Sequence, residues 1–245
     1  YNQGKYDLAI EAYQKFLDAH AGHERTPDVR FGLAQALFQQ GQYEAAARAY
    51  EQLRNDYKDF AQMPEVLFQL AQARVALNQF AQAEPIFAEV QTRFGDHYLA
   101  DWALARQAAC LISLQKFDPA EAKLKTFLDR YAPPGGPAER APATVEMFRR
   151  LDESGLKARE AFLTLIERSL FHLAIASFNQ NRFDEATTAF ARFLKDYPSS
   201  SLADEARFRI AQSFFRQERY AEAAKAYEPV AGEFDGASRI VARAL

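Results

Sequence analysis

The side chains best suited to metal chemistry in this sequence are its four histidines. His20 and His23 lie three residues apart, but spacing fixes no third ligand beside them, and a zinc site needs three or four. His97 falls in an expected turn, where we expect it to be solvated, and His172 falls in a helical pattern, where we expect it to be packed or to face a groove. We therefore predict that the chain holds no metal.

Nucleophiles and phosphate-binding loops are equally poorly represented. The one cysteine, Cys110, stands among apolar residues, which predicts a small buried hydrophobe rather than a reactive thiol. No serine stands in a Gly-x-Ser-x-Gly elbow. The pair Gly135-Gly136 precedes Pro137 rather than a lysine and a helix. We therefore predict no enzyme activity and no cofactor.

Composition points to a helical protein with a continuous core. Of the 245 residues, 49% are hydrophobic, and only 10 Gly and 10 Pro are present, so long flexible linkers are not expected. The net charge is -3, with acids and bases interspersed, which argues against a nucleic-acid-binding surface because that would show a basic stripe. No uninterrupted apolar run approaches the roughly 18 residues of a membrane span.

One pattern recurs along the chain: a turn residue, an aromatic residue, an alanine three positions later and a second large residue four beyond that. It is clearest after Gly41, with Tyr43, Ala46 and Tyr50. The lead aromatics recur 37 residues apart, first at Tyr6, Tyr43, Phe80 and Phe117, then at Phe183 and Tyr220. A fixed period in this range indicates stacked structural repeats.

Each repeat is predicted to hold two helices, which makes the fold class all-α. Gly41 and Asn78 are expected to end first helices, because both residue types tolerate a left-handed backbone. Small alanines are expected to let paired helices approach closely, with the aromatics filling the wider gaps; they stand at Ala46, Ala83, Ala120, Ala186 and Ala223.

The pattern resembles the tetratricopeptide repeat (TPR), a helix-turn-helix unit. Its first-helix signature, a large apolar residue followed by a small one, appears as Leu33-Ala34, Leu70-Ala71, Leu173-Ala174 and Ile210-Ala211, and its terminal proline appears as Pro198. The fourth copy departs from it, with Gln107-Ala108 and Leu124. The resemblance covers nearly the whole chain and implies a right-handed superhelical solenoid of TPR units with a period of 37.

The expected organisation has three parts. Residues 1–131 hold TPR repeats, of which the first is truncated, and residues 156–245 hold further repeats with an extended first helix and a truncated last repeat. Between them, residues 132–155 form an insertion with a Pro- and Gly-rich loop and a short helix carrying Val145, Phe148 and Leu151 on one face. We interpret this insertion either as a tolerated surface loop or as a helix that folds back on the array or contacts a partner. Pro229 is expected to kink the last second helix.

In the resembled family, first helices line a concave face that holds peptides or partner helices. Carried over residue by residue, the predicted groove positions are Phe31, Gln35, Phe38, Phe68, Gln72, Trp102, Phe171, Ile175, Phe178, Asn179, Phe208, Gln212, Phe215 and Arg216. Any of these aromatics has an alternative role as packing between repeats. The basic carboxylate clamp of chaperone-docking relatives is lacking, because Arg30 and Arg216 do not make one.

A narrower resemblance runs from Asp196 to Ala223, which is similar to the longer-period repeats of bacterial cell-envelope proteins. The periplasmic coordinator of the Tol-Pal system and the lipoprotein of the outer-membrane assembly machine carry such repeats. We therefore expect a non-catalytic scaffold that binds one or more proteins or peptides, with no nucleic acid, in a larger complex of the bacterial periplasm or outer membrane. A cytoplasmic location is the alternative. The alternative functions are an accessory glycan- or export-machinery-binding domain, or a regulatory sensor module fused to an enzyme.

Overall fold

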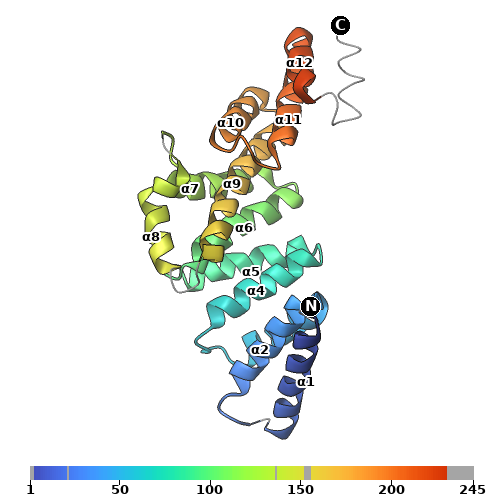
Figure 1. Cartoon of the computed structure of the whole chain (residues 1–245), viewed down its shortest axis with the longest axis vertical. Coiled ribbons are helices and arrows are strands. Elements are labelled where there is room, and N and C mark those ends of the chain that lie inside the picture. Colours follow the sequence, from blue (N-terminus) through green and yellow to red (C-terminus); the bar gives the residue numbers. More distant parts are fainter. Residues whose placement is uncertain (1–2, 21, 136, 152–155, 231–245) are drawn as a thin grey trace. The chain divides into compact units, whose positions relative to one another are not determined.

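The computed structural model describes residues 3–20, 22–135, 137–151 and 156–230, and Figure 1 shows its elements. The described residues form α-helices and short 3-10 turns with no strand among them, as the repeat pattern predicted. The chain divides into two compact units, unit 1 (Tyr1–Leu114) and unit 2 (Gln115–Leu245).

Unit 1 is a run of helices in which each helix packs on the next along the chain. The first of them corresponds to a second helix of a repeat, and first and second helices then alternate. The elements are α1 (Gln3–Ala19), α2 (Thr26–Gln39), α3 (Tyr43–Asp56), α4 (Met63–Ala76), α5 (Phe80–Arg93) and α6 (Leu99–Ser113).

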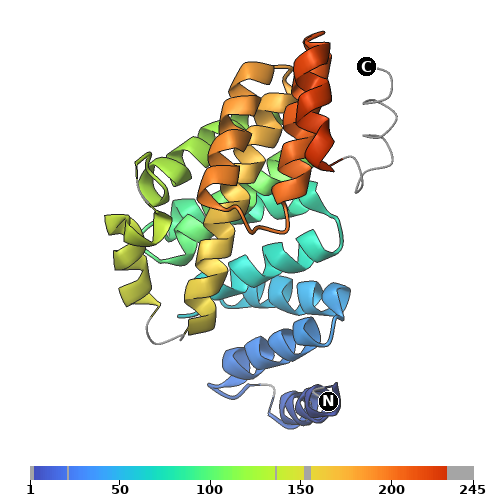
Figure 2. The ribbon, with the colours of Figure 1, turned by 45° about the horizontal axis from the view of Figure 1, so that its top comes forward.

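In unit 2, each helix does not simply pack on the next, because α7 packs mainly on α9 and only lightly on α8. From α9 onward the consecutive order returns, and α9 and α10 lie side by side in Figures 1 and 2. The elements are α7 (Phe117–Tyr131), η1 (Ala138–Arg140), α8 (Pro142–Arg150), α9 (Leu156–Asn179), α10 (Phe183–Asp196), α11 (Ala203–Arg216), α12 (Tyr220–Tyr227) and η3 (Glu228–Val230).

The core follows the repeat pattern. The five alanines expected at close helix contacts, from Ala46 to Ala223, are all fully buried. The large residue four positions later is also fully buried in these five copies, at Tyr50, Phe87, Leu124, Phe190 and Tyr227, whereas Tyr13 of the first copy is half-buried. Replacing a buried ring of this kind with alanine costs about 3–5 kcal/mol, so these positions define which helices pair.

The turn between first and second helix repeats one left-handed residue. The prediction is confirmed at Gly41 (φ 83°) and Asn78 (φ 57°). The backbone there closes a Schellman motif, in which Gln42 N donates to Leu37 O at 2.9 Å and Gly41 N donates to Phe38 O at 2.9 Å. The same place in other copies is held by Asn181 (φ 60°), of the same residue type as Asn78, and by Gln115 (φ 59°) and Glu218 (φ 62°), whose types gave no signal in the sequence.

The insertion folds back onto unit 2. Thr144, Met147 and Leu151 of this segment are buried, and the Thr144 hydroxyl donates to Tyr131 O at 3.2 Å. The predicted face of Val145, Phe148 and Leu151 is therefore wrong in part, since Val145 is 40% exposed. The loop brings α8 back to α7 in an orientation in which Thr144, rather than Val145, contacts α7. The expected helix end at Ser154-Gly155 lies outside the described residues.

One other expectation needs correction, and one helix has a composition that the sequence pattern did not single out. The helix before Pro229 does not continue through a kink: α12 ends at Tyr227 and the proline lies in η3, because it cannot donate the backbone hydrogen bond that would extend the α-helix. Among the residues that the structure describes, one helix has the length and composition of a membrane span, Lys157–Asn179 within α9, with a mean hydropathy of 1.4. A core helix of a folded unit passes the same test, and 56% of this window is buried.

Candidate functional site

The predicted groove positions of unit 1 divide into packed and accessible side chains. Phe68 is buried against Phe87, with ring centroids 5.6 Å apart. Phe31 is half-buried and meets Tyr50 edge-on at 6.1 Å. Gln35 is exposed, whereas Phe38, Gln72 and Trp102 are half-buried.

Gln35 and Phe38 come together at a cavity of about 450 Å³ on α1 and α2. No charged residue lines it; the lining residues are Tyr6, Ala9, Tyr13, Gly32, Gln35, Ala36, Phe38, Gln39, Tyr50 and Gln69. Gly32 lets α1 approach, since a Cβ there would stand 2.8 Å from the Tyr13 ring.

Two buried polar atoms belong to residues that line this cavity. The hydroxyl of Tyr50 and the side-chain oxygen of Gln69 find no hydrogen-bond partner among the described residues. Burial raises the pKa of Tyr50, so its hydroxyl is a protonated donor. Because both atoms are buried, leaving them unpaired costs the fold about 1–3 kcal/mol each.

In unit 2, the groove positions divide in the same way. Phe171 and Phe178 are buried, and Phe171 packs on Phe190 with centroids 5.6 Å apart. Ile175, Phe208 and Gln212 are half-buried; Asn179 and Arg216 are exposed.

Phe215 is the accessible aromatic of this set. It is 37% exposed and stacks edge-on against Tyr220, which is 48% exposed. Burial therefore removes Phe68, Phe171 and Phe178 from the surface available to a ligand. The partner-binding role of the other positions stays a prediction.

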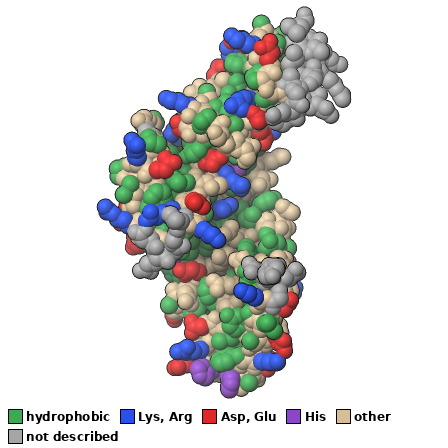
Figure 3. Space-filling view, in the orientation of Figure 1, with side chains coloured by type: hydrophobic (Ala, Val, Ile, Leu, Met, Phe, Trp, Pro, Cys, Tyr) green, Lys and Arg blue, Asp and Glu red, His purple; other side chains and the backbone are tan. Residues whose placement is uncertain are grey.

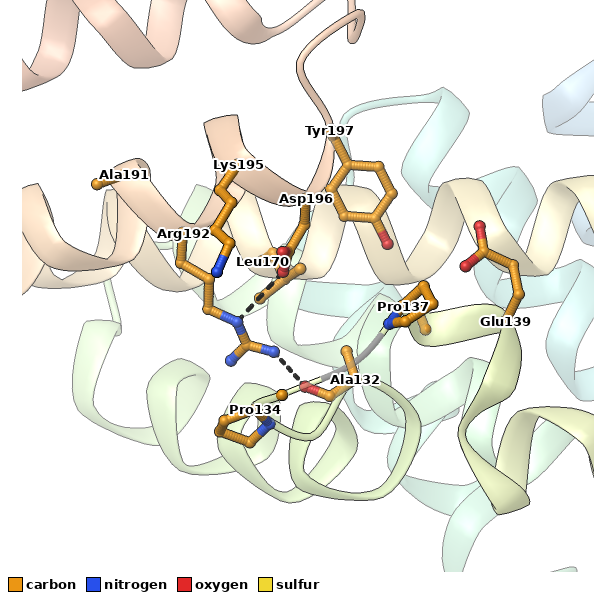
Figure 4. Close-up of a pocket in the computed structure, with 12 residues that line it drawn as sticks. Ala132, Pro134, Pro137, Glu139, Leu170, Ala191, Arg192, Lys195, Asp196 and Tyr197 are labelled. Atoms are coloured by element: carbon orange, nitrogen blue, oxygen red, sulfur yellow. Dashed lines mark hydrogen bonds and ion pairs between the residues drawn. The ribbon is translucent and has the colours of Figure 1, made fainter.

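A second feature was missed in the sequence: a cavity of about 690 Å³ beside the insertion in unit 2. One wall is the loop from Ala132 to Glu139, the floor is Leu170 of α9, and the other wall is the end of α10. Figure 4 shows the Arg192 guanidinium reaching from α10 to the loop, where it donates to Ala132 O; its Nε lies 3.4 Å from the Asp196 carboxylate. This arginine ties the loop to α10.

Beside it lies a smaller cavity of about 450 Å³, lined by α7, α9 and α10. Glu121 of α7 is buried there and receives ion pairs from Arg182 and from Lys125 (2.6 Å), and Gln180 Nε2 donates to it at 3.2 Å. Burial works to raise the pKa of Glu121, but the hydrogen bonds from Arg182 and Lys125 outweigh it and hold that pKa below its ordinary value.

Within the described ranges, no group of three or more His, Cys, Asp or Glu side chains could hold a metal ion. Cys110 is buried, and burial, with Glu84 nearby, raises the pKa of its thiol to about 12. The thiol is therefore protonated near neutral pH, which removes the nucleophilic form. On the face seen in Figure 3, acidic and basic side chains are mixed with hydrophobic ones.

Solved structures share this architecture. MamA residues 41 to the end, from Desulfovibrio magneticus RS-1, superposes with a TM-score of 0.59 at 16% identity, covering 83% of this chain and 92% of that one. BtubC from P. vanneervenii gives 0.57 at 14% identity, covering 98% and 90%. A putative kinesin light chain with nearly identical TPR-like repeats, from Podosopora anserina, gives 0.55 at 15% identity, covering 86% and 96%. At these identities the likeness shows the fold alone.

Sequence profiles agree with the fold. No curated protein matches the chain significantly. A profile described as tetratricopeptide repeat matches residues 1–59 and 171–239, more than half of the chain, and a second profile of the same description matches residues 65–97. The chain belongs to the tetratricopeptide-repeat family.

Proposed function

We propose that the chain is a non-catalytic scaffold that binds a peptide or a partner helix through first-helix positions of its repeats. The observation that carries this is the cavity of about 450 Å³ at Gln35 and Phe38, whose lining residues are uncharged. Gln35 and Gln39, which are exposed and line this cavity, can pair with the N–H and carbonyl groups of a peptide backbone. Aromatic walls with a few polar groups are typical of ligand sites of about 300–1,000 Å³.

The proposal is tested by placing charge in that cavity. Gln35 is exposed, so Gln35→Arg should leave the helices intact while opposing a neutral peptide. Gln52→Arg on the exposed side of α3 is the matched control. Affinity capture from extracts of the source cells, followed by mass spectrometry, should lose its specific partners with Gln35→Arg and keep them with Gln52→Arg. Identical partners in both, with unchanged circular dichroism, would remove this cavity from the function.

We also propose a bacterial envelope setting, as part of a larger complex in the periplasm or at the outer membrane. Its support is the likeness of residues 196–223 to the longer-period repeats of envelope proteins. Cell fractionation of the protein encoded by the full reading frame tests it. Recovery in the cytoplasm alone would contradict the envelope setting without affecting the binding proposal.

A further inference from the structure

The two cavities of unit 2 are adjacent, and the surface that they make together is called the groove below. Both are lined by Leu170 and Arg192, so they meet at these residues. Together they follow α10 from Asp184 to Tyr197, with α9 beneath and α7 and the insertion opposite. At 1.5 Å per helical residue, this course is about 20 Å long, which matches about six residues of extended chain.

The same place in unit 1 is filled by larger side chains. Aligning the repeats by their lead aromatics, Phe80 and Phe183, puts Ile86 at the position of Ala189. Ile86 is buried at 6% exposure, whereas Ala189 is half-buried and lines the groove. In the first helices, Arg74 of unit 1 stands where unit 2 has Ser177. The groove therefore results from smaller side chains on an unchanged pair of helices.

The smaller side chains leave apolar surface uncovered. Leu70 of α4 is fully buried, but its counterpart Leu173 of α9 is half-buried and lines the smaller cavity. An apolar floor of this kind favours an occupant that brings an aliphatic side chain to it.

The charged positions of the groove also differ from their counterparts in unit 1. In unit 1, Glu51 pairs with Arg74 at 3.3 Å and Glu89 pairs with Arg54. In unit 2, Lys125 stands at the position of Glu51. Arg192 takes the position of Glu89, and Leu128 that of Arg54. The walls of the groove thus carry cations where unit 1 supplies carboxylates of its own.

The acids of the groove are mostly paired already. Asp184 lies 3.6 Å from Arg219, and Glu185 lies 3.0 Å from Arg182. Lys195, in contrast, makes no ion pair with any residue that the structure describes. An incoming carboxylate therefore has a cation to meet on the α10 side.

Further polar groups line the insertion end. Glu139 on the loop has no ion pair within the described part of the chain, so that wall does not favour an acid. Tyr197 turns its hydroxyl toward this wall in Figure 4. Burial raises the pKa of Tyr197, and the nearby carboxylates of Glu139 and Asp196 raise it further, so the phenol is a hydrogen-bond donor.

We propose that this groove binds an extended segment of a partner protein, about six residues long, with a branched aliphatic side chain where unit 1 has Ile86 and a carboxylate beside Lys195 and Arg192. A helix does not suit the space. Spread along about 20 Å, the two cavities have a mean cross-section of about 57 Å², whereas a helix about 10 Å across needs about 79 Å². The site is independent of the first-helix cavity in unit 1.

The test uses selection of a phage-displayed random heptapeptide library on the whole chain. Peptides are expected to be enriched for an aliphatic residue near an acid. Ala189→Ile, which installs the side chain that unit 1 has, should weaken those peptides about tenfold or more by filling the groove. Ala161→Ile, the same change at an exposed position of α9, should leave them unaffected.

Charge reversal gives a second readout that does not depend on packing. Lys195→Glu is at an exposed position and should weaken acidic peptides about tenfold while basic counterparts gain. The proposal is overturned if no peptide is enriched, or if Ala189→Ile and Lys195→Glu bind the selected peptides as the parent chain does. It is also overturned if Gln35→Arg abolishes their binding, because the peptides would then occupy the cavity of unit 1.

Discussion

Helices α3, α4 and α5 of unit 1 and helices α7, α9 and α10 of unit 2 occupy the same repeat positions but are joined by different polar contacts. In unit 1, the contacts are partly exposed: Arg74, with 15% of its side chain exposed, lies 3.3 Å from Glu51 and donates to Gln79 at 2.9 Å. In unit 2, one carboxylate, Glu121, is 7% exposed and takes Arg182 as its main partner. The comparison teaches that the repeat fixes the backbone, while the polar contacts between repeats are local and exchangeable.

The largest effect should come from the packing that only unit 2 has. Phe162, in the extended part of α9, is fully buried and packs edge-on against Tyr131 with centroids 4.9 Å apart. Phe162→Ala should reduce the free energy of unfolding by about 3–5 kcal/mol. Hydrogen exchange read by mass spectrometry should show faster exchange in unit 2 and unchanged exchange in unit 1. Equal loss of protection in both units would contradict the division of the chain.

Next in size is the removal of the main partner of Glu121. Arg182→Ala leaves the buried Glu121 carboxylate without this ion pair and should reduce the free energy of unfolding by about 2 kcal/mol. The matched control comes from unit 1, which has Ala47 and Gln79 at these two positions. The double variant Glu121→Ala with Arg182→Gln should therefore recover most of the loss in urea unfolding, and no recovery would show that Arg182 acts by other contacts.

This ion pair also predicts a pH dependence. The pKa of Glu121 is lowered in the folded protein, so its contribution is present above the unfolded pKa and is lost as the pH falls through the folded one. With an unfolded value of about 4.3, the loss should occur below about pH 4.5. In Arg182→Ala, the burial that raises the pKa is less opposed, so the loss should begin at higher pH. Unfolding titrations between pH 3 and 7 measure the shift.

The corresponding change in unit 1 should be smaller and more sensitive to salt. Arg74→Ala removes a partly exposed ion pair and one hydrogen bond, so a cost of about 1 kcal/mol is expected. Raising the salt concentration to 1 M should reduce that cost, since the Debye length falls to about 3 Å, while the cost of Arg182→Ala should change less. Equal salt dependence for both would remove the distinction between the two contacts.

The smallest effect should come from the turns. The turn of unit 1 after α2 has Gly41, whereas the turn of unit 2 after α11 has Glu218 at φ 62°. Glu218→Gly should stabilise unit 2 by about 0.5–1 kcal/mol, because glycine adopts this conformation without a Cβ penalty. Gly41→Ala should destabilise unit 1 by a similar amount. Thermal unfolding of each variant shows whether its stability rises or falls. A loss of stability in Glu218→Gly would contradict the proposal that the left-handed backbone at residue 218 is strained.

Particular residues show which parts of the fold and of the candidate site could be predicted from the sequence. The period of 37 predicted the pairing of helices and the buried alanines, because these depend on the repeating pattern itself. It did not predict the buried face of α8, which depends on how the Pro- and Gly-rich loop returns to α7 and occurs once. The family resemblance assigned Phe68 and Phe178 to the groove, although both are buried, because position in a helix does not reveal which neighbour covers a ring.

The groove beside α10 was within reach of the sequence. Aligning the repeats shows Ala189 opposite Ile86 and Ser177 opposite Arg74, which is a loss of volume at two neighbouring positions. In a repeat protein, the other repeats of the same chain show which side chains fill such a contact. The contribution of the insertion loop to the larger cavity could not be read in this way, since no other copy has such a loop.

The buried thiol of Cys110 has a practical consequence. With its pKa raised to about 12, it should react slowly with maleimides near pH 7 in the folded chain. New cysteines at exposed positions, such as Gln52→Cys and Ala161→Cys, can then carry a donor and an acceptor dye without removal of the native residue. Energy transfer between the dyes would report whether the distance between the two labelled positions changes when a peptide binds.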